Sequence, residues 1–241
     1  MKTNKIIEAI RQEIKTSAEK NFRKNSQKFH QEKIVCYEVR TPIVRKIAAK
    51  YFKQIKTLSK EENFNLSEKL LKSNFNEEAT IAIQWVGKLS KHFEKKDFEI
   101  FEEWLGKYMD NWAKVDDFCL HVIQPMIEKY PELIDKVKSW SRSGNMWLRR
   151  ASAVSFIATI DGFYATKQNL ADIFEVAENL LQDKEDLVQK GCGWMLKAAS
   201  VHHQKQVFDF VMKHKQQMPR TALRYAIEKM PDESRKQAME K

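Results

Sequence analysis

A tryptophan and an aspartate four residues apart are the side chains in this sequence whose types and spacing most directly suggest chemistry. The stretch NWAKVDDF, residues 111–118, has helical character and places Trp112 and Asp116 one above the other on one helix face. An indole face attracts cations, and a carboxylate stabilises a developing positive charge and can orient a water molecule. Taken alone, the pair is explained more simply by an indole N–H that meets a carboxylate at the edge of a groove.

Two later stretches carry similar residue types. Arg149 and Arg150 lie in NMWLRRASA (145–153), and Lys190 and Trp194 lie four residues apart in VQKGCGWML (188–196). Arginine binds phosphate or carboxylate through paired hydrogen bonds, so Arg150 has a structural alternative as the partner of a carboxylate on a neighbouring helix. The recurrence of indoles and cations on successive predicted helices favours a functional site over separate structural pairs.

The elements that must position these side chains are predicted to be helices. With only 6 Gly and 5 Pro, the sequence offers few turns for short strands, and most segments show a helical apolar stripe followed by a short polar break. Asn76, Asn145 and Asp183 are expected to be N-caps of such helices. The only strand-like run, KIVCYEV (33–39), is predicted to be a buried connector, because a single strand has no sheet to join. Three tryptophans lie within apolar stripes and are expected in the core: Trp85, Trp104 and Trp140.

Similar helices that recur every few tens of residues predict the fold class. Roughly a dozen helices joined by short breaks are typical of stacked antiparallel helix pairs of the HEAT type. We therefore expect an all-α fold, an α-α superhelix or HEAT-like helical repeat solenoid with a basic concave groove, formed by residues 1–241 as a single domain. The repeat signal is degenerate, so a compact helical bundle remains an alternative.

The net charge of +10 is unevenly distributed. Residues 1–60 hold 16 Lys and Arg against 5 Asp and Glu, whereas the rest of the chain holds 27 against 28. A basic N-terminal quarter suits a polyanion such as nucleic acid, although charged helix surfaces are often merely solvated.

Several functional classes are disfavoured by missing motifs. Cys36, Cys119 and Cys192 are far apart and odd in number, and the histidines show no ligand spacing, so neither disulfides nor a metal site is expected. No apolar run is long enough to span a bilayer and no signal peptide is recognisable, which predicts a cytoplasmic protein without membrane contact. Glycine-rich phosphate loops, H-E-x-x-H and G-x-S-x-G are also missing, and no cofactor is expected.

Four short motifs together resemble a known family. YEVRTPIVRKIA (37–48), NWAKVDDF, NMWLRRASA and VQKGCGWML are similar, in order and spacing, to the DNA alkylation repair glycosylases of the AlkD-like, HEAT-repeat class, and the resemblance extends from about residue 5 to about residue 230. It implies a helical solenoid that holds duplex DNA in a basic concave groove. It also implies hydrolysis of the N-glycosidic bond of cationic alkylpurines such as 3-methyladenine and 7-methylguanine.

The resemblance assigns roles to individual residues. Trp112 and Trp194 match the two lesion-facing indoles of the family, Asp116 its catalytic carboxylate, and Arg150 the arginine that holds the DNA backbone beside the lesion. Further DNA contacts are expected from cations near these motifs and on the last helices: Arg149, Lys190, Arg45, Lys46, Arg220 and Arg224.

Three positions depart from the family pattern. Ala113 stands where an acidic residue often follows the first tryptophan, Phe29 where a tyrosine is frequent, and Glu38 where a glycine is common. These departures concern the details of DNA contact, because the four residues that would carry the chemistry are all retained.

The proposed chemistry fits these residue types. A cationic alkylpurine leaves without protonation, so the enzyme needs a carboxylate that stabilises the oxocarbenium-like sugar and orients water, as in glycoside hydrolysis. Strand cleavage would need an amine nucleophile. Lys114 and Lys190 are near the relevant residues, but Lys114 is predicted to point away from the Trp112 and Asp116 face, so strand cleavage is not expected.

Three hypotheses from different classes follow. The first is a monofunctional DNA-alkylpurine N-glycosylase that acts as a monomer on duplex DNA containing alkylated bases. The second is a non-catalytic HEAT-repeat protein that recognises distorted or branched DNA. The third is a protein-binding helical scaffold, which the basic excess disfavours.

Overall fold

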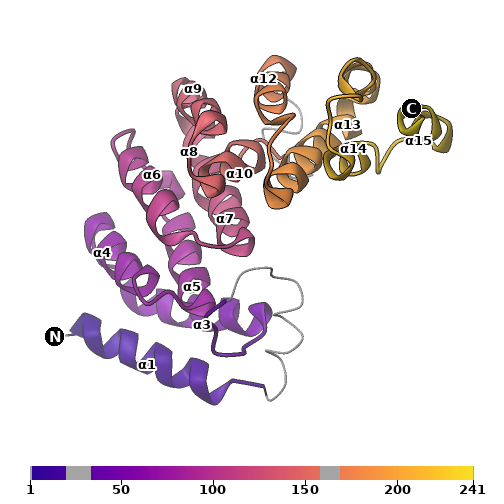
Figure 1. The fold of residues 1–241 in the computed structure, drawn as a ribbon. Helices are drawn as coiled ribbons and strands as arrows, with labels where there is room; N and C mark the ends of the chain where they lie inside the picture. Colours follow the sequence, from indigo (N-terminus) through magenta and orange to yellow (C-terminus); the bar gives the residue numbers. More distant parts are fainter. Residues whose placement is uncertain (1, 20–33, 158–168, 241) are drawn as a thin grey trace. The chain divides into compact units, whose positions relative to one another are not determined.

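Helices form all of the regular structure in the described part of the chain (Figure 1). A computed structural model describes residues 2–19, 34–157 and 169–240, and no strand occurs within these ranges. The all-α class is therefore confirmed. Contacts divide the chain into two compact units, Met1–Met126 and Ile127–Lys241, and the division falls within helix α8 (Gln124–Lys129). The single-domain organisation of residues 1–241 stays a prediction.

The first unit is built around helix α5 (Asn76–Gly87). Helix α5 contacts α3 (Thr41–Ile55), α4 (Lys60–Leu71) and α7 (Trp112–Phe118), and it also contacts the π-helical turn η2 (Cys119–Ile123). Helix α1 (Lys2–Thr16) packs on α3, and the short helix η1 (Ser90–His92) precedes α6 (Asp97–Tyr108). Trp85 of α5 is fully buried and donates its indole N–H to the carbonyl of Ala48, 2.9 Å away.

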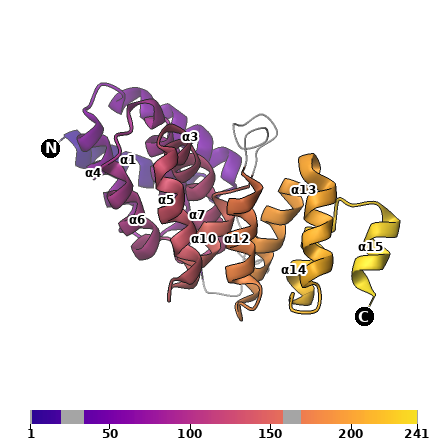
Figure 2. The same cartoon turned by 90° about the horizontal axis from the view of Figure 1, so that it is seen from above.

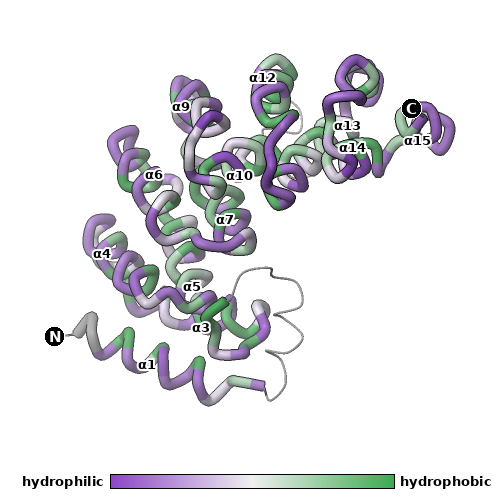
Figure 3. Tube along the Cα trace, viewed as in Figure 1, coloured by the Kyte–Doolittle hydropathy of each residue, from purple (hydrophilic) through white to green (hydrophobic). Residues whose placement is uncertain are grey.

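Helix α1 illustrates why these segments are helical. Ile7, Ile10 and Ile14 recur at spacings of three and four residues, and all three are buried. Figure 3 shows the resulting alternation of hydrophobic and hydrophilic residues along this helix. An apolar stripe of this kind gains its stability from packing, because an isolated helix of this length is marginal in water.

The helix starts follow local chemistry, with two differences from the prediction. Asn145 caps α10 (Met146–Val154) by accepting the N–H of Trp147, as expected. Asn76 is wrong as a cap, because it is already the first residue of α5 and Phe75 precedes the helix. Asp183 is also wrong, since α13 (Asp186–His214) begins after Glu185. Asp183 instead accepts the backbone N–H of Glu185 in the preceding turn, 2.9 Å away.

The connector before α3, residues 34–40, belongs to no helix or strand; Lys33 lies outside the described residues. Glu77 of α5 holds it, because its carboxylate accepts the backbone N–H groups of Tyr37 at 3.0 Å and Val39 at 3.1 Å. Between them Glu38 has a φ of 74°. Glycine adopts this left-handed conformation without steric cost, which explains why glycine suits this position of the motif.

The second unit is organised around the long helix α13. Helix α13 contacts α10, α12 (Leu170–Leu180) and α14 (Arg220–Ala226), and Figure 2 shows these helices side by side. A kink at His203, with φ −132° and ψ 45°, divides α13. The unit also contains η3 (Pro131–Leu133), α9 (Ile134–Ser139), η4 (Trp140–Arg142) and α15 (Asp232–Met239).

Candidate functional site

The tryptophans separate into two groups by burial. Those expected in the core are almost completely buried: Trp85, Trp104 and Trp140. Trp112 and Trp194, which are assigned to the site, are only half-buried. A residue that contacts a ligand must be partly accessible from solvent, and both of these tryptophans are.

Helix α7 holds Trp112 and Asp116 one turn apart. The helix begins at Trp112 because Asn111 caps it, accepting the N–H groups of Ala113 at 3.1 Å and Lys114 at 3.2 Å. Asp116 is 8% exposed, so its carboxylate lies at the boundary between core and surface. The i, i+4 relation predicted from the sequence is thus present in the structure.

Asp117, which the sequence motifs do not single out, is a charged neighbour of Asp116 with contacts of its own. Its Oδ1 lies 3.3 Å from Nη2 of Arg45 on α3 and 3.3 Å from Nδ1 of His121 in the turn η2. Burial raises the pKa of Asp117 above its usual value, and the charges of His121 and Arg45 oppose that shift. The contact between Asp117 and His121 could be predicted from their spacing of four residues on a helix. The contact with Arg45 could not, because Arg45 is 72 residues away in the sequence.

The turn that contains His121 is unusual. Residues Cys119–Ile123 form a π-helical turn, and such turns often occur at functional sites. Helix α5 packs closely against this turn. A Cβ atom at Gly87 would lie only 2.9 Å from the carbonyl oxygen of His121. Gly87 therefore allows α5 to approach the end of the Trp112 and Asp116 helix closely.

Lys114 points away from the candidate site, as predicted. Its side chain is 3% exposed, and its ammonium group is bound by Asn74 and Asp110. A lysine held in this way is a poor candidate for an amine nucleophile.

In the second unit Arg150 is almost completely buried. It is 5% exposed, and its Nη1 donates to the carbonyl of Leu187 in the first turn of α13. A Cβ at Gly191 would lie 3.4 Å from Cγ and 3.5 Å from Nη1 of Arg150, which are ordinary van der Waals distances, so the side chain of Arg150 packs beside this glycine. Arg150 is therefore held in a defined position against α13.

The neighbouring positive charges have protein partners. Arg149 donates to Asp183 at 2.6 Å and to the carbonyls of Ser143 and Gly144. Lys190 pairs with Asp186 at 2.7 Å. Arg149 could contact a DNA phosphate only by giving up hydrogen bonds to Asp183, Ser143 or Gly144. It therefore already has a structural role.

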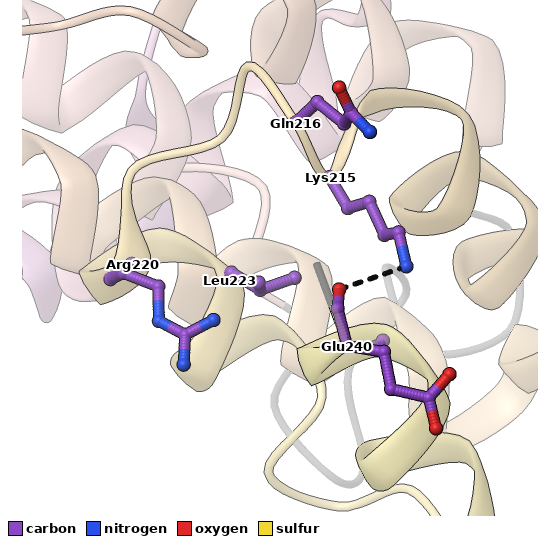
Figure 4. Close-up of a pocket in the computed structure, with 6 residues that line it drawn as sticks. Lys215, Gln216, Arg220, Leu223 and Glu240 are labelled. Atoms are coloured by element: carbon purple, nitrogen blue, oxygen red, sulfur yellow. Dashed lines mark hydrogen bonds between the residues drawn. The ribbon is translucent and has the colours of Figure 1, made fainter.

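The outer cations differ in environment. Arg45, Lys46 and Arg224 are exposed, and Arg45 is the one of these that pairs with Asp117. Arg220 lines a pocket of about 290 Å³ at the end of the second unit, together with Lys215, Gln216, Leu223, Ala238 and Glu240 (Figure 4). Lys215 donates to the carbonyl of Glu240 across this pocket, 3.1 Å away.

The predicted residues thus form two sets. The first unit contains Trp112 and Asp116, together with Arg45, which contacts the neighbouring Asp117. The second unit contains Arg150 on α10 and Lys190 and Trp194 on α13. That both sets line one site stays a prediction. Phe29 lies outside the described residues.

The described part of the chain has neither a cluster of metal ligands nor a helix that could span a membrane. Within residues 2–19, 34–157 and 169–240, His, Cys, Asp and Glu form no group of three or more that could hold a metal ion. Across the same ranges, no helix combines the length and apolar character that crossing a bilayer requires.

Comparison with known proteins identifies the family. The structure matches that of a predicted DNA alkylation repair enzyme from Enterococcus faecalis with a TM-score of 0.79 and 14% sequence identity, covering 90% of this chain and 98% of that chain. This match is consistent with the predicted helical-repeat superhelix. No curated protein sequence matches the chain. A family model described as DNA alkylation repair enzyme matches residues 10–230, and the chain therefore belongs to this family.

Proposed function

We propose that the protein is a monofunctional DNA glycosylase that releases cationic alkylated purines, such as 3-methyladenine and 7-methylguanine, from duplex DNA. The observation that carries the proposal is the pair on α7, a half-buried indole at Trp112 one turn from a largely buried carboxylate at Asp116. Membership of a DNA alkylation repair family supplies the substrate context.

The positive charge of the substrate determines the chemistry. As the bond between C1′ and the purine nitrogen breaks, its electrons neutralise the cationic base, and the sugar becomes oxocarbenium-like. Asp116 stabilises this cation and orients a water molecule, whose oxygen bonds to C1′ while its proton passes to Asp116 and then to solvent. No cofactor is needed for this hydrolysis.

Tryptophan and arginine have separate tasks in this mechanism. The faces of Trp112 and Trp194 attract the cationic nucleotide in preference to its neutral parent. Arg150 pairs with a phosphate near the lesion and fixes the register of the DNA without reading its sequence. Arg45, Lys46, Arg220 and Arg224 contact the backbone further away, as does Lys190 after it leaves Asp186.

The decisive experiment is release of free methylated base from methylated duplex DNA by wild type and by Asp116→Asn. We expect the variant to keep its DNA affinity and to lose most turnover, by about a hundredfold or more, because the amide carries no negative charge. The matched control is Asp135→Asn, which changes a carboxylate whose side chain is 87% exposed and should release base at the wild-type rate.

The remaining outcomes are equally informative. Equal loss of DNA binding and turnover in Asp116→Asn would reject the role assigned to this carboxylate. No base release by wild type, with DNA binding retained, would place the protein with non-catalytic proteins that recognise distorted or branched DNA.

A further inference from the structure

The start of helix α7 is held by a polar network that the proposed chemistry does not use; Lys114 and Asn111 are buried in it, and Asp110 lies at its surface. Lys114 is 4% exposed and Asn111 is 2% exposed, although both carry strongly polar side chains. Burying such groups costs free energy unless every donor and acceptor finds a partner. Their presence one or two residues from Trp112 therefore calls for a physical explanation.

The ammonium group of Lys114 is fully matched by acceptors. Its three N–H groups face three oxygen atoms: Asn74 Oδ1 at 2.7 Å, Asp110 Oδ1 at 2.8 Å and the Asn74 carbonyl at 3.2 Å. Asn74 belongs to the turn between α4 and α5, and its φ of 62° is left-handed. Lys114 thus ties α7 to a turn 40 residues away in the sequence.

Asn111 completes the same network. Its Oδ1 caps α7, while its Nδ2 donates to Asn76 Oδ1 at 2.9 Å and to Asp110 Oδ1 at 3.1 Å. Asp110 Oδ1 therefore accepts from both Lys114 and Asn111. Because Trp112 lies between the cap and Lys114, the direction of its Cα–Cβ bond is set by bonds on both sides.

We infer that Lys114, acting with Asn111 and Asn74, is a positioning residue that aims Trp112 and Asp116. Replacing a buried ion pair as a whole by well-packed apolar residues is often neutral for stability, so stability alone does not explain why an ammonium group is buried here. The ammonium supplies what an apolar group does not, namely three directional bonds that fix the rotation and position of the first turn of α7. The inference deepens the proposed function and rests on it for its catalytic consequence.

The first test is Lys114→Met, with Lys107→Met as the matched control. Lys107 is an exposed lysine of α6 that pairs with Glu103 one turn away. We expect Lys114→Met to keep its helix content and its DNA affinity within about twofold, while base release at saturating DNA falls on the order of tenfold to a hundredfold. The control should match wild type in all three measurements.

A second readout does not depend on activity. This readout is the quenching of Trp112 fluorescence by acrylamide. The signal of Trp112 is obtained by subtracting the fluorescence of the same protein carrying Trp112→Phe. Lys114→Met should raise this quenching, because the indole is no longer held in one direction. If wild type released no base, the proposed glycosylase function would fail, yet changed quenching would still support the positioning role.

Asn74→Gly covers the case in which Lys114→Met does not fold. It removes the Oδ1 acceptor but keeps the carbonyl, and glycine adopts the left-handed φ of this position without strain. It should change base release and quenching in the same direction as Lys114→Met, but less. Unchanged Trp112 quenching in a folded Lys114→Met or Asn74→Gly protein, with unchanged base release, would overturn the inference.

Discussion

At the scale of single residues, Asp116 and Asp117 are adjacent carboxylates with different surroundings. Asp117 contacts the guanidinium group of Arg45 and the imidazole of His121, and its Oδ2 is buried without a hydrogen-bond partner among the described residues. An unsatisfied buried carboxylate oxygen favours the neutral acid, which agrees with the raised pKa of Asp117. We assign Asp117 a structural task, in its contacts with Arg45 and His121, beside the proposed catalytic task of Asp116.

This difference predicts how Asp117→Asn changes stability with pH. Because burial raises the pKa of Asp117, the folded protein keeps a proton there at pH values where the unfolded chain has lost it. The stabilising contribution of the protonated form is complete below the unfolded pKa and is lost as the pH rises through the folded pKa. The amide does not titrate, so the stability of wild type relative to Asp117→Asn should decrease between about pH 4.5 and about pH 7.5.

Urea unfolding of both proteins at the two pH values measures this difference. The control is Asp135→Asn, whose carboxylate is exposed and whose substitution should give the same small difference at both pH values. A rise in the relative stability of wild type with pH would show that the pairing with Arg45 and His121 outweighs burial.

At the scale of elements, the close approach of α13 and α14 depends on a glycine of α13. Gly193 lies where α13 crosses α14. A Cβ atom at Gly193 would lie 2.5 Å from Cβ of Tyr225 and 2.7 Å from the carbonyl oxygen of Ala222. Because the second of these atoms is backbone, the crossing helix itself would have to move.

Gly193→Ala should therefore lower the free energy of unfolding by about 1 to 3 kcal/mol, even though alanine is the better helix former. The measurement is the urea midpoint, with Gly144→Ala as the control, since no atom lies within 4 Å of a Cβ built at Gly144. Equal midpoints for the two variants would mean that α13 and α14 separate at little cost.

At the scale of the whole molecule, the excess positive charge lies in the first quarter of the chain. For duplex DNA, the logarithm of the binding constant K falls linearly with the logarithm of the salt concentration. Each phosphate that a protein cation neutralises makes this slope steeper by about 0.9. A basic surface that meets several phosphates therefore gives binding that weakens strongly with salt. This dependence tests the proposed DNA contacts without requiring catalysis.

Lys46→Gln should reduce that salt slope by about 1 and weaken binding equally for methylated and unmodified duplexes, because a phosphate contact carries no base information. Lys46 is exposed on α3. Lys205→Gln serves as the control, since Lys205 is an exposed lysine of α13 that pairs with Asp209 one turn away. An unchanged slope in Lys46→Gln would remove this residue from the proposed DNA contacts.

Local features of the sequence determined the helices and the pair on α7. Apolar stripes, the cap at Asn145 and the spacing of Trp112 and Asp116 each depend on residues within a turn or two, so their physical basis can be read along the chain. The caps predicted at Asn76 and Asp183 are wrong because α5 and α13 start at other residues, and the side chains of Asn76 and Asp183 also bond to Asn111 and Arg149, which are distant in the sequence.

Only the tertiary structure decided which cations are engaged and which polar groups surround the site. Arg45 meets Asp117 across 72 residues, Lys114 meets Asn74 across 40 and Arg149 meets Asp183 across 34. Such pairs form because packed helices bring their side chains within bonding distance and exclude water, and no local spacing encodes that approach. The sequence by itself therefore determined the helices and the residues proposed for chemistry, whereas packing between distant helices decided how those residues are held.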